Sequence, residues 1–208
     1  SGSLDVGDPA TFARARKAPP ATRAIHPATT ANSTRSPTSR LPEVEVWPLE
    51  GPWRGRLAVC SRPRAGWFLA DDIRHLRESG YNLLISALTA EEVVRSELQS
   101  VPSVCEAAGM EFAHFPVGNL QVAPFEHAHA RLTSWNERLH GGEGVAVHCW
   151  ASVGRGPTLA AALMVLGGVE PAEAWARIRA SRGRDVPDTG EQRAWAAAFA
   201  ARTGIELA

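Results

Sequence analysis

Apolar and polar positions along the chain predict short strands separated by helices from Val44 onward. The runs expected to form strands are 44–47, 57–60, 83–88, 112–117 and 144–148, and the mostly apolar third run is typical of a buried strand. Helical spacing and helix-end residues indicate helices over 68–76, from about 90, and over 101–108, 125–139, 156–167, 171–182 and 189–203. Strands that alternate with helices and then give way to a helical C-terminal third predict an α/β fold with a central, mostly parallel sheet flanked by helices.

The first 41 residues lack this pattern. They are rich in Ala, Thr, Ser, Pro and Arg and almost without large hydrophobic residues, so they bury too little apolar surface to offset the entropy of ordering. The sequence therefore predicts a flexible leader over 1–41 and one folded domain over 42–208. The basic residues of the leader leave two interpretations open, an inert linker or a weak contact with acidic surfaces.

The overall composition narrows the class of protein. Of the 208 residues, 44% are hydrophobic and 21% are charged, and 22 Lys and Arg balance 22 Asp and Glu to a formal net charge of zero. A protein that binds nucleic acid through bulk phosphate attraction usually carries a positive excess. We therefore expect no nucleic-acid partner.

Cysteine usage and hydropathy exclude further classes. The three cysteines, Cys60, Cys105 and Cys149, are too few and too scattered for a disulfide framework, and there is no C-x-x-C pair for structural zinc. The longest apolar run, 157–169, is shorter than the roughly 20 residues that a membrane span needs. We therefore expect a cytoplasmic protein with free thiols and no membrane span. The pattern gives no indication of an oligomeric state.

The candidate chemistry lies at 148–158, where the last expected strand meets an Ala- and Leu-rich helix. Cys149 follows the strand directly, five residues intervene, and Arg155 precedes the helix. Small residues in such a strand–loop–helix turn several backbone N–H groups toward one point, where the helix N-terminus adds its positive dipole end. A thiol in this cradle is expected to ionise readily and act as a nucleophile. The Arg155 guanidinium can bind two phosphate oxygens side by side.

This pattern, Cys149-x5-Arg155 preceded by His148, resembles the signature of the cysteine-based protein tyrosine phosphatases, especially their small dual-specificity branch. The similarity covers about residues 43–203, including the segments 69–88, 115–117 and 186–189. The resemblance implies a phosphotyrosine-phosphatase-like fold and a catalytic role for Cys149 and Arg155, with His148 tuning the thiolate. It also implies that the phosphate is bound by Trp150, Ala151, Ser152, Val153, Gly154 and Arg155.

The loop departs from the family pattern at two positions. Relatives usually have Gly where Ser152 stands, so the loop is either stiffer here or gains a hydroxyl donor. They usually have Ser or Thr directly after the arginine, where its hydroxyl helps the thiolate to leave, and here that residue is Gly156. Breakdown of a phosphocysteine intermediate is therefore expected to be slow, unless Ser152 or Thr158 supplies the hydroxyl.

A third departure concerns the general acid. In the resembling family, an Asp shortly after a Phe-Pro-hydrophobic strand end protonates the leaving group, which is worth about 10²–10⁴-fold in rate. Asn119 occupies that position, and an amide cannot supply the proton. Possible substitutes are Glu126, His127, His129 and Asp188, with the alternative that the first three are solvated residues of a helix.

Three side features complete the candidate site. Gln192 corresponds to the Gln that orients hydrolytic water in some tyrosine phosphatases, and it also suits the first turn of a helix capped by Thr189 or Asp188. Trp150 either lines the pocket rim or packs against the Asn119 loop. Cys60 or Cys105 is either a plain core cysteine or a partner for Cys149 in a protective disulfide.

Together these observations favour a cysteine-dependent phosphatase that hydrolyses phosphate monoesters through a phosphocysteine intermediate, with phosphotyrosine or another aryl phosphate preferred. A phenolic leaving group needs protonation less than an alkyl one, hence the preference. The expected partner is a phosphorylated protein or a small phosphoester, and the reaction requires no metal or organic cofactor. One alternative is a weakly active or inactive pseudophosphatase that binds phosphorylated residues, because Asn119 stands at the acid position. Another is a cysteine-based activity on a different small phosphorylated or arsenate-like anion.

Overall fold

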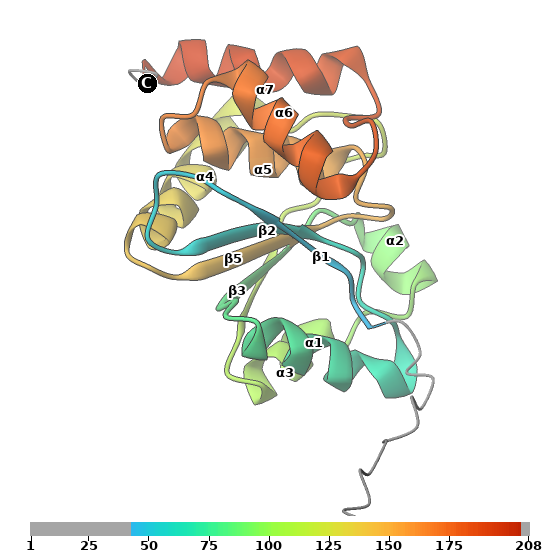
Figure 1. Cartoon of the computed structure of the whole chain (residues 1–208). Coiled ribbons are helices and arrows are strands. Elements are labelled where there is room, and N and C mark those ends of the chain that lie inside the picture. The colour runs from blue at the N-terminus through green and yellow to red at the C-terminus, as the bar shows by residue number, and fades with distance from the viewer. Residues whose placement is uncertain (1–42, 205–208) are drawn as a thin grey trace, which may run out of the picture. The chain divides into compact units, whose positions relative to one another are not determined.

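The structure, a computed structural model, describes residues 43–204. A five-stranded sheet forms the centre of this part of the chain (Figure 1). These residues belong to one compact unit, Ser39–Ala208, and the expected leader at 1–41 lies outside the described residues. The strand order is β1-β2-β5-β3-β4. Strand β1 (Val46–Leu49) pairs antiparallel with β2 (Arg56–Cys60), and β5 (Gly144–His148), β3 (Leu83–Ser86) and β4 (Glu111–His114) continue the sheet in parallel. The expected α/β fold with a central, mostly parallel sheet is confirmed.

Helices cover both faces of this sheet (Figure 1). One face carries α4 (Phe125–His140), α5 (Arg155–Leu166), α6 (Pro171–Arg182) and α7 (Gly190–Thr203). The other carries α1 (Leu69–Glu78), preceded by the short 3-10 helix η1 (Gly66–Phe68), and α3 (Val101–Ala107). The short helix α2 (Ala90–Arg95) lies beyond the end of β3. None of the described helices is both long and apolar enough to cross a membrane.

The two layers enclose separate cores because successive residues of a strand point to opposite faces of the sheet. In β2, Leu57 and Val59 pack under α4–α7, whereas Ala58 and Cys60 pack against α1 and α3. The same alternation occurs in β5, where Val145 and Val147 flank Ala146. Both faces of the inner strands are buried, which explains why the sequence shows apolar runs there rather than a clean alternation.

Three expected strands differ from the structure in their bounds. The third, expected over 83–88, ends at Ser86, beyond which the Ala87 amide still donates to the His148 carbonyl (2.9 Å) but the Leu88 amide donates to the Ser86 hydroxyl (3.4 Å). Local hydrogen bonds also explain the other two differences. The first begins at Val46 rather than 44, because the amides of Val44 and Glu45 donate to the side chains of Asp72 (3.3 Å) and Ser61 (2.9 Å) instead of to a strand. The fourth ends at His114 rather than 117. The chain beyond it still follows the segment after β3, with Phe115 N donating to Ser86 O (2.9 Å) and Val117 N donating to Ala87 O (3.3 Å).

The topology gathers several loops at one edge of the sheet. Strands β2, β5, β3 and β4 run in the same direction, so their carboxyl ends meet there. The segments that leave this edge begin with Ser61 after β2, Cys149 after β5, Ala87 after β3 and Phe115 after β4. Ligand sites of parallel α/β sheets lie at this edge, and each of these segments contributes to the site described next.

Candidate active site

The loop after β5 is short and is fixed from behind. Ser152, the third residue after Cys149, has a left-handed φ of 53°, and its buried hydroxyl donates to the carbonyl of Cys60. The amide of Cys149 donates to the Ser152 hydroxyl (3.5 Å), and Arg182 Nε on α6 donates to the Ser152 carbonyl (2.9 Å). The Ser152 hydroxyl is thus used to hold the loop in shape, which supports the stiffer loop of the two sequence interpretations.

The curved backbone of this loop leaves donors available. Within the described chain, the amides of residues 150–154 donate to no other protein group, while 152–154 are buried. Buried amides without a partner are costly unless a ligand satisfies them. Helix α5 begins immediately afterwards at Arg155, so its positive dipole end faces the same place. This arrangement suits an anion of several oxygens.

Arg155 is held by the carboxylate of Glu92 in α2, the short helix that follows β3. Its Nη1 and Nη2 donate to the two carboxylate oxygens of Glu92 at 2.6 Å and 2.8 Å, and Nη1 also donates to the carbonyls of Val117 (2.9 Å) and Ala87 (3.3 Å). Both side chains are nearly buried, with 3% and 11% of their surface exposed. The pair stays charged: the hydrogen bonds from Arg155 lower the pKa of Glu92, against burial. Burial alone would lower the pKa of Arg155, but the bonds to Glu92 and nearby negative charge raise it.

This bonding pattern determines which donors of Arg155 can meet a substrate. Glu92 takes the terminal pair of nitrogens, and the carbonyls use the remaining Nη1 hydrogen. The Nε hydrogen and the second Nη2 hydrogen are not used by Glu92 or by the carbonyls, and a side-chain hydrogen bond to Cys149 is among the interactions that raise the pKa of Arg155. These two hydrogens form the parallel fork of the guanidinium, an edge whose geometry suits two oxygens of a phosphate side by side.

His148 sits beneath the loop with 1% of its surface exposed. Its Nδ1 donates to the carbonyl of Cys149 at 3.3 Å, because a carbonyl can only accept. Burial, the largest effect, lowers the pKa of the imidazole to about 4, so the ring is neutral near pH 7. His148 therefore orients the Cys149 backbone, and it does so without contributing a positive charge.

Cys149 is itself 3% exposed, and the residue that faces its sulfur is Gly156. A Cβ atom placed on Gly156 would lie 3.7 Å from Cys149 Sγ. The hydroxyl of Thr158 instead donates to the Gly154 carbonyl (3.0 Å). With Ser152 bonded to Cys60, neither expected substitute hydroxyl is directed at the thiol.

A cavity of about 550 Å³ opens beside the loop, and Asn119 and Trp150 both line it together with Thr89, Glu91, Glu92 and Arg95. The Trp150 ring lies between two guanidinium groups, 3.9 Å from Arg62 and 4.2 Å from Arg95. Trp150 thus lines the rim, and the packing partners found for its ring are Arg62 and Arg95. Asn119 is exposed in the turn after β4, so the structure brings the expected acid position to the mouth of the same cavity.

The start of α7 approaches the loop from the other side. The Asp188 carboxylate and the Gln192 amide would lie 2.3 Å and 2.8 Å from a Cβ on Gly154, so a side chain there would force both of these side chains to move. Thr189 and Gln192 form a reciprocal capping box, as the sequence suggested. The Gln192 amide also donates to the carbonyl of Gln121 (3.2 Å), which ties α7 to the Asn119 loop.

Three of the four substitute acids have other partners. Glu126 pairs with Arg202 at 3.0 Å, His127 stacks on Phe115, and His129 stacks on Phe125, so all three belong to the surface and packing of α4. The interpretation of these three as helix residues is the one that the contacts support. Asp188 alone lies next to the loop.

The two remaining cysteines differ in their relation to Cys149. Burial, and then the charge of Cys149, raise the pKa of Cys60, whereas burial alone raises the pKa of Cys105 to about 12. Both are free and packed in the core between the sheet and α1 and α3. A protective disulfide stays a prediction. Of the two cysteines, only Cys60 has a pKa that the charge of Cys149 affects.

Sequence reasoning missed Glu92 as a site residue, although it identified the Thr89–Glu92 capping box that the structure confirms. The capping box by itself accounts for a Glu at position 92, so the sequence held no further reason to look for a partner. The contact with Arg155 joins residues 63 positions apart. Arg62 and Gln121 were also missed, since each contributes through a single long-range contact. Metal ligation was not expected, and the described residues hold no cluster of three or more His, Cys, Asp or Glu that could bind a metal ion.

A thiol at the base of an amide-lined loop, followed after five residues by an arginine at a helix start, defines the class of cysteine-based protein tyrosine phosphatases, in their small dual-specificity form. Residues 53–201 match the family model described as "Swiss Army Knife protein, DSP-PTPase phosphatase domain". This match covers well over half of the chain, and the chain belongs to that family of phosphatase domains.

Several solved structures share this fold. Kinase associated phosphatase (KAP), in a form with its catalytic cysteine replaced by serine, superposes with a TM-score of 0.71 at 16% identity, covering 81% of this chain and all of the other. Tk-PTP in its active form gives 0.59 at 23% identity, over 71% and 93% of the two chains. A variant of human DUSP28 gives 0.56 at 13% identity, over 79% and 98%. At these identities the likeness shows the fold alone. A search of curated proteins finds no match.

Proposed function

We propose that residues 42–208 form a cysteine-dependent phosphatase domain that hydrolyses phosphate monoesters in two steps. In the first, the thiolate of Cys149 attacks phosphorus in line, the bond from phosphorus to the ester oxygen breaks, and that oxygen leaves with the bonding electron pair as an oxide, which then takes a proton from water. In the second, water attacks phosphorus, the sulfur–phosphorus bond breaks, and inorganic phosphate and the thiolate are released. Water is the only co-reactant.

The observation that carries this proposal is the arrangement around Cys149. The amides of 150–154 have no protein acceptor in the described chain, and Glu92 leaves one edge of the Arg155 guanidinium unused, so the loop that carries the sulfur holds donors that can balance the charge of a phosphoryl group. Glu92 holds the guanidinium in place before substrate arrives, so the donors need no reorganisation during the reaction. The same arrangement supports phosphate-binding roles for the loop residues, from Trp150 to Arg155.

The residues around the entrance support an aryl phosphate as the preferred substrate. Asn119 lines the cavity at the expected acid position and cannot donate a proton to a leaving oxygen. An aryl oxide leaves without full protonation, whereas an alkoxide does not. The half-buried Trp150 lines the same cavity as Asn119, with Arg62 and Arg95 stacked on its ring. We assign Gln192 to positioning α7 against the loop, with water orientation as its second role.

A second candidate function, phosphoresidue binding without turnover, is favoured by two specific observations. Position 119 carries an amide instead of a carboxylic acid. Position 156 carries no hydroxyl, although a Cβ added there would lie only 3.7 Å from the sulfur of Cys149. Both losses slow chemistry and leave the anion cradle intact. The domain would then capture a phosphorylated residue and release it unchanged.

Burst kinetics on 4-nitrophenyl phosphate separates the two functions. A stoichiometric burst followed by a slower steady state, both abolished by Cys149→Ser, supports the two-step phosphatase. Binding of phosphate or vanadate by both proteins with no release of nitrophenol from either supports the binding module. Turnover that survives Cys149→Ser would overturn both, because it would place the chemistry elsewhere.

A further inference from the structure

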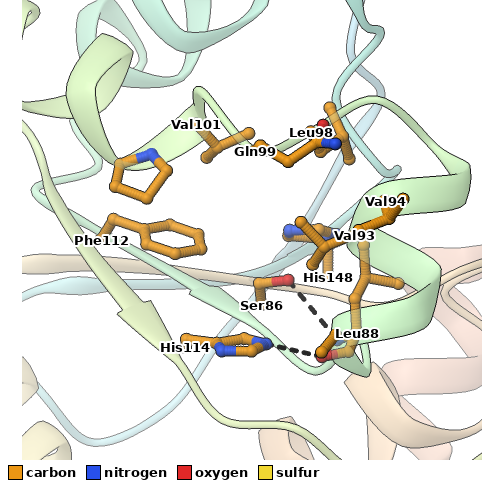
Figure 2. A pocket seen from close by; sticks show the side chains of 12 residues that line it. Ser86, Leu88, Val93, Val94, Leu98, Gln99, Val101, Phe112, His114 and His148 are labelled. Carbon is orange, nitrogen blue, oxygen red and sulfur yellow. Dashed lines mark hydrogen bonds between the residues drawn. The ribbon is translucent and has the colours of Figure 1, made fainter.

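A second cavity, of about 480 Å³, lies away from the mouth of the phosphate cradle, among α2, α3, β3 and β4 (Figure 2). Its walls are mainly apolar side chains, namely Leu88, Val93, Val94, Leu98, Val101 and Phe112. The volume is within the range of sites for small organic molecules, roughly 300–1,000 Å³. None of its lining residues is Asp, Glu, Lys or Arg.

The inner end of this cavity is polar, and His148 supplies the decisive atom (Figure 2). Its Nδ1 is engaged with the Cys149 carbonyl, and its Nε2 is buried with no hydrogen-bond partner among the described residues. The neutral ring carries its hydrogen on Nδ1, so Nε2 presents a lone pair. A buried acceptor of this kind is costly to leave unpaired.

Two further polar groups border His148. The Ser86 hydroxyl accepts from the Leu88 amide (3.4 Å), which leaves its own hydrogen free to turn toward an acceptor. His114 Nε2 donates to the Leu88 carbonyl (2.8 Å), so its donor is already used. The cavity therefore offers one acceptor at Nε2 of His148 and one donor at Ser86, in neighbouring strands whose registers align Ser86 with His148.

We propose that this cavity is a binding site for a small, uncharged, mostly apolar molecule that carries a hydroxyl group. The hydroxyl donates to Nε2 of His148 and accepts from Ser86, while the rest of the molecule fills the space between α2 and α3. A charged ligand is disfavoured, because none of the lining residues is Asp, Glu, Lys or Arg, whose charge would offset the desolvation of the ligand.

The site is separate from the phosphate cradle but adjoins two of its supports. His148 precedes Cys149 directly, and α2, which contributes Ala90, Val93 and Val94 to the wall, also carries Glu92, the partner of Arg155. An occupant therefore contacts the helix that orients the guanidinium. The proposal concerns binding, and it stands or falls independently of whether the domain turns over phosphate.

The test uses 4-ethylphenol as the probe and its methyl ether, 4-ethylanisole, as a matched control that lacks the donor. Titration of the full chain, followed by the ring ¹⁵N signals of isotopically labelled histidine, should show saturable binding of the phenol with a dissociation constant on the order of 1 mM. The His148 Nε2 signal should move to lower ¹⁵N shift, as expected for a lone pair that accepts a hydrogen bond. The ether should bind about tenfold more weakly, since one buried hydrogen bond is lost.

A variant pair locates the probe. Val94 is 61% exposed at the rim, so Val94→Trp is expected to fold and to fill the cavity opening, weakening the phenol at least about tenfold. Glu106→Trp places the same side chain at an exposed position of α3 outside the cavity and should leave binding unchanged. The proposal is overturned if the phenol does not saturate, if the ether binds equally well, or if both variants behave alike.

Discussion

At the scale of single residues, the absence of a side chain at Gly156 is the feature with the clearest kinetic consequence. The position faces the nucleophile, and an added Cβ would make only ordinary contacts, at 3.5 Å to the Cys149 amide nitrogen and 3.7 Å to its sulfur. Space therefore exists for a hydroxyl that would hydrogen-bond the sulfur. Such a bond stabilises the thiolate as it leaves phosphorus in the second step.

We expect Gly156→Ser to raise the steady-state rate on 4-nitrophenyl phosphate about tenfold while leaving the burst amplitude unchanged, since a hydrogen bond to a charged group is worth about 1.5–3 kcal/mol. Stopped-flow measurement of both phases tests this. Gly156→Ala adds the same Cβ without the hydroxyl and should not accelerate the second step. Equal acceleration by Ala would show that the hydroxyl is irrelevant.

Glu92 is the residue on which the orientation of Arg155 depends. Glu92→Gln keeps the shape but removes the charge and one acceptor, so the guanidinium loses its bidentate anchor. We expect kcat/KM for an aryl phosphate to fall about 10–100-fold, in line with the loss of about 1.5–3 kcal/mol. Glu91→Gln is the control, because Glu91 lines the same cavity and is exposed. A comparable loss in both variants would mean that cavity charge matters, rather than the anchor.

The same pair predicts a pH dependence of stability. The pKa of Glu92 is lower in the folded chain than its ordinary value of 4.5, chiefly through the hydrogen bonds from Arg155. A carboxyl with a depressed pKa contributes stability above its unfolded pKa, and this contribution is lost as the pH falls through the folded value. The free energy of urea unfolding of the wild type should therefore fall more steeply below about pH 4.5 than that of Glu92→Gln does. Equal slopes for the two proteins would contradict the shift.

At the scale of elements, the sequence predicted the local helix caps but not the long-range contacts that join one element to another. The capping boxes at Thr89 and Thr189 follow from residues three apart, and both are present. The Glu92–Arg155 pair and the Gln192–Gln121 bond depend on which strand ends become neighbours, and a linear pattern does not contain that information. The segment 115–117 has the apolar pattern of a strand, and it does run beside the chain that follows β3. Because β3 has already ended there, 115–117 is not part of the sheet.

The loop after β4 determines whether the domain can protonate a leaving group. Asn119 lies in its exposed turn, at the mouth of the cavity beside Trp150. We expect Asn119→Asp to raise kcat about 100-fold or more for an alkyl phosphate and less for 4-nitrophenyl phosphate, because only the alkyl leaving group needs the proton. The activity of the variant should fall as the pH rises through the pKa of the new carboxyl.

Asn119→Ala is the matched control for this substitution, since it removes the amide and supplies no acid. A rate gain in both variants would indicate that the amide obstructs the substrate. No gain in the Asp variant, with the burst intact, would point to Asp188 at the start of α7 as the group already serving as acid. Asp188→Asn should then abolish the turnover that remains.

At the scale of the whole molecule, the described residues contain every group that the mechanism uses, and the family match ends within them at 201. Helix α7 is part of this unit: Phe199 is 1% exposed in the core, and Gln192 is buried against the loop. The chain from 42 to 208 should therefore retain the melting temperature and the burst kinetics of the full chain. A chain that ends at 189 should not fold. Removing α7 exposes the apolar surface of α5 and takes Phe199 and the other apolar side chains of α7 out of the core, which leaves a large cavity. Thermal unfolding and circular dichroism distinguish the outcomes, and loss of activity on removal of 1–41 would assign the leader a part in catalysis.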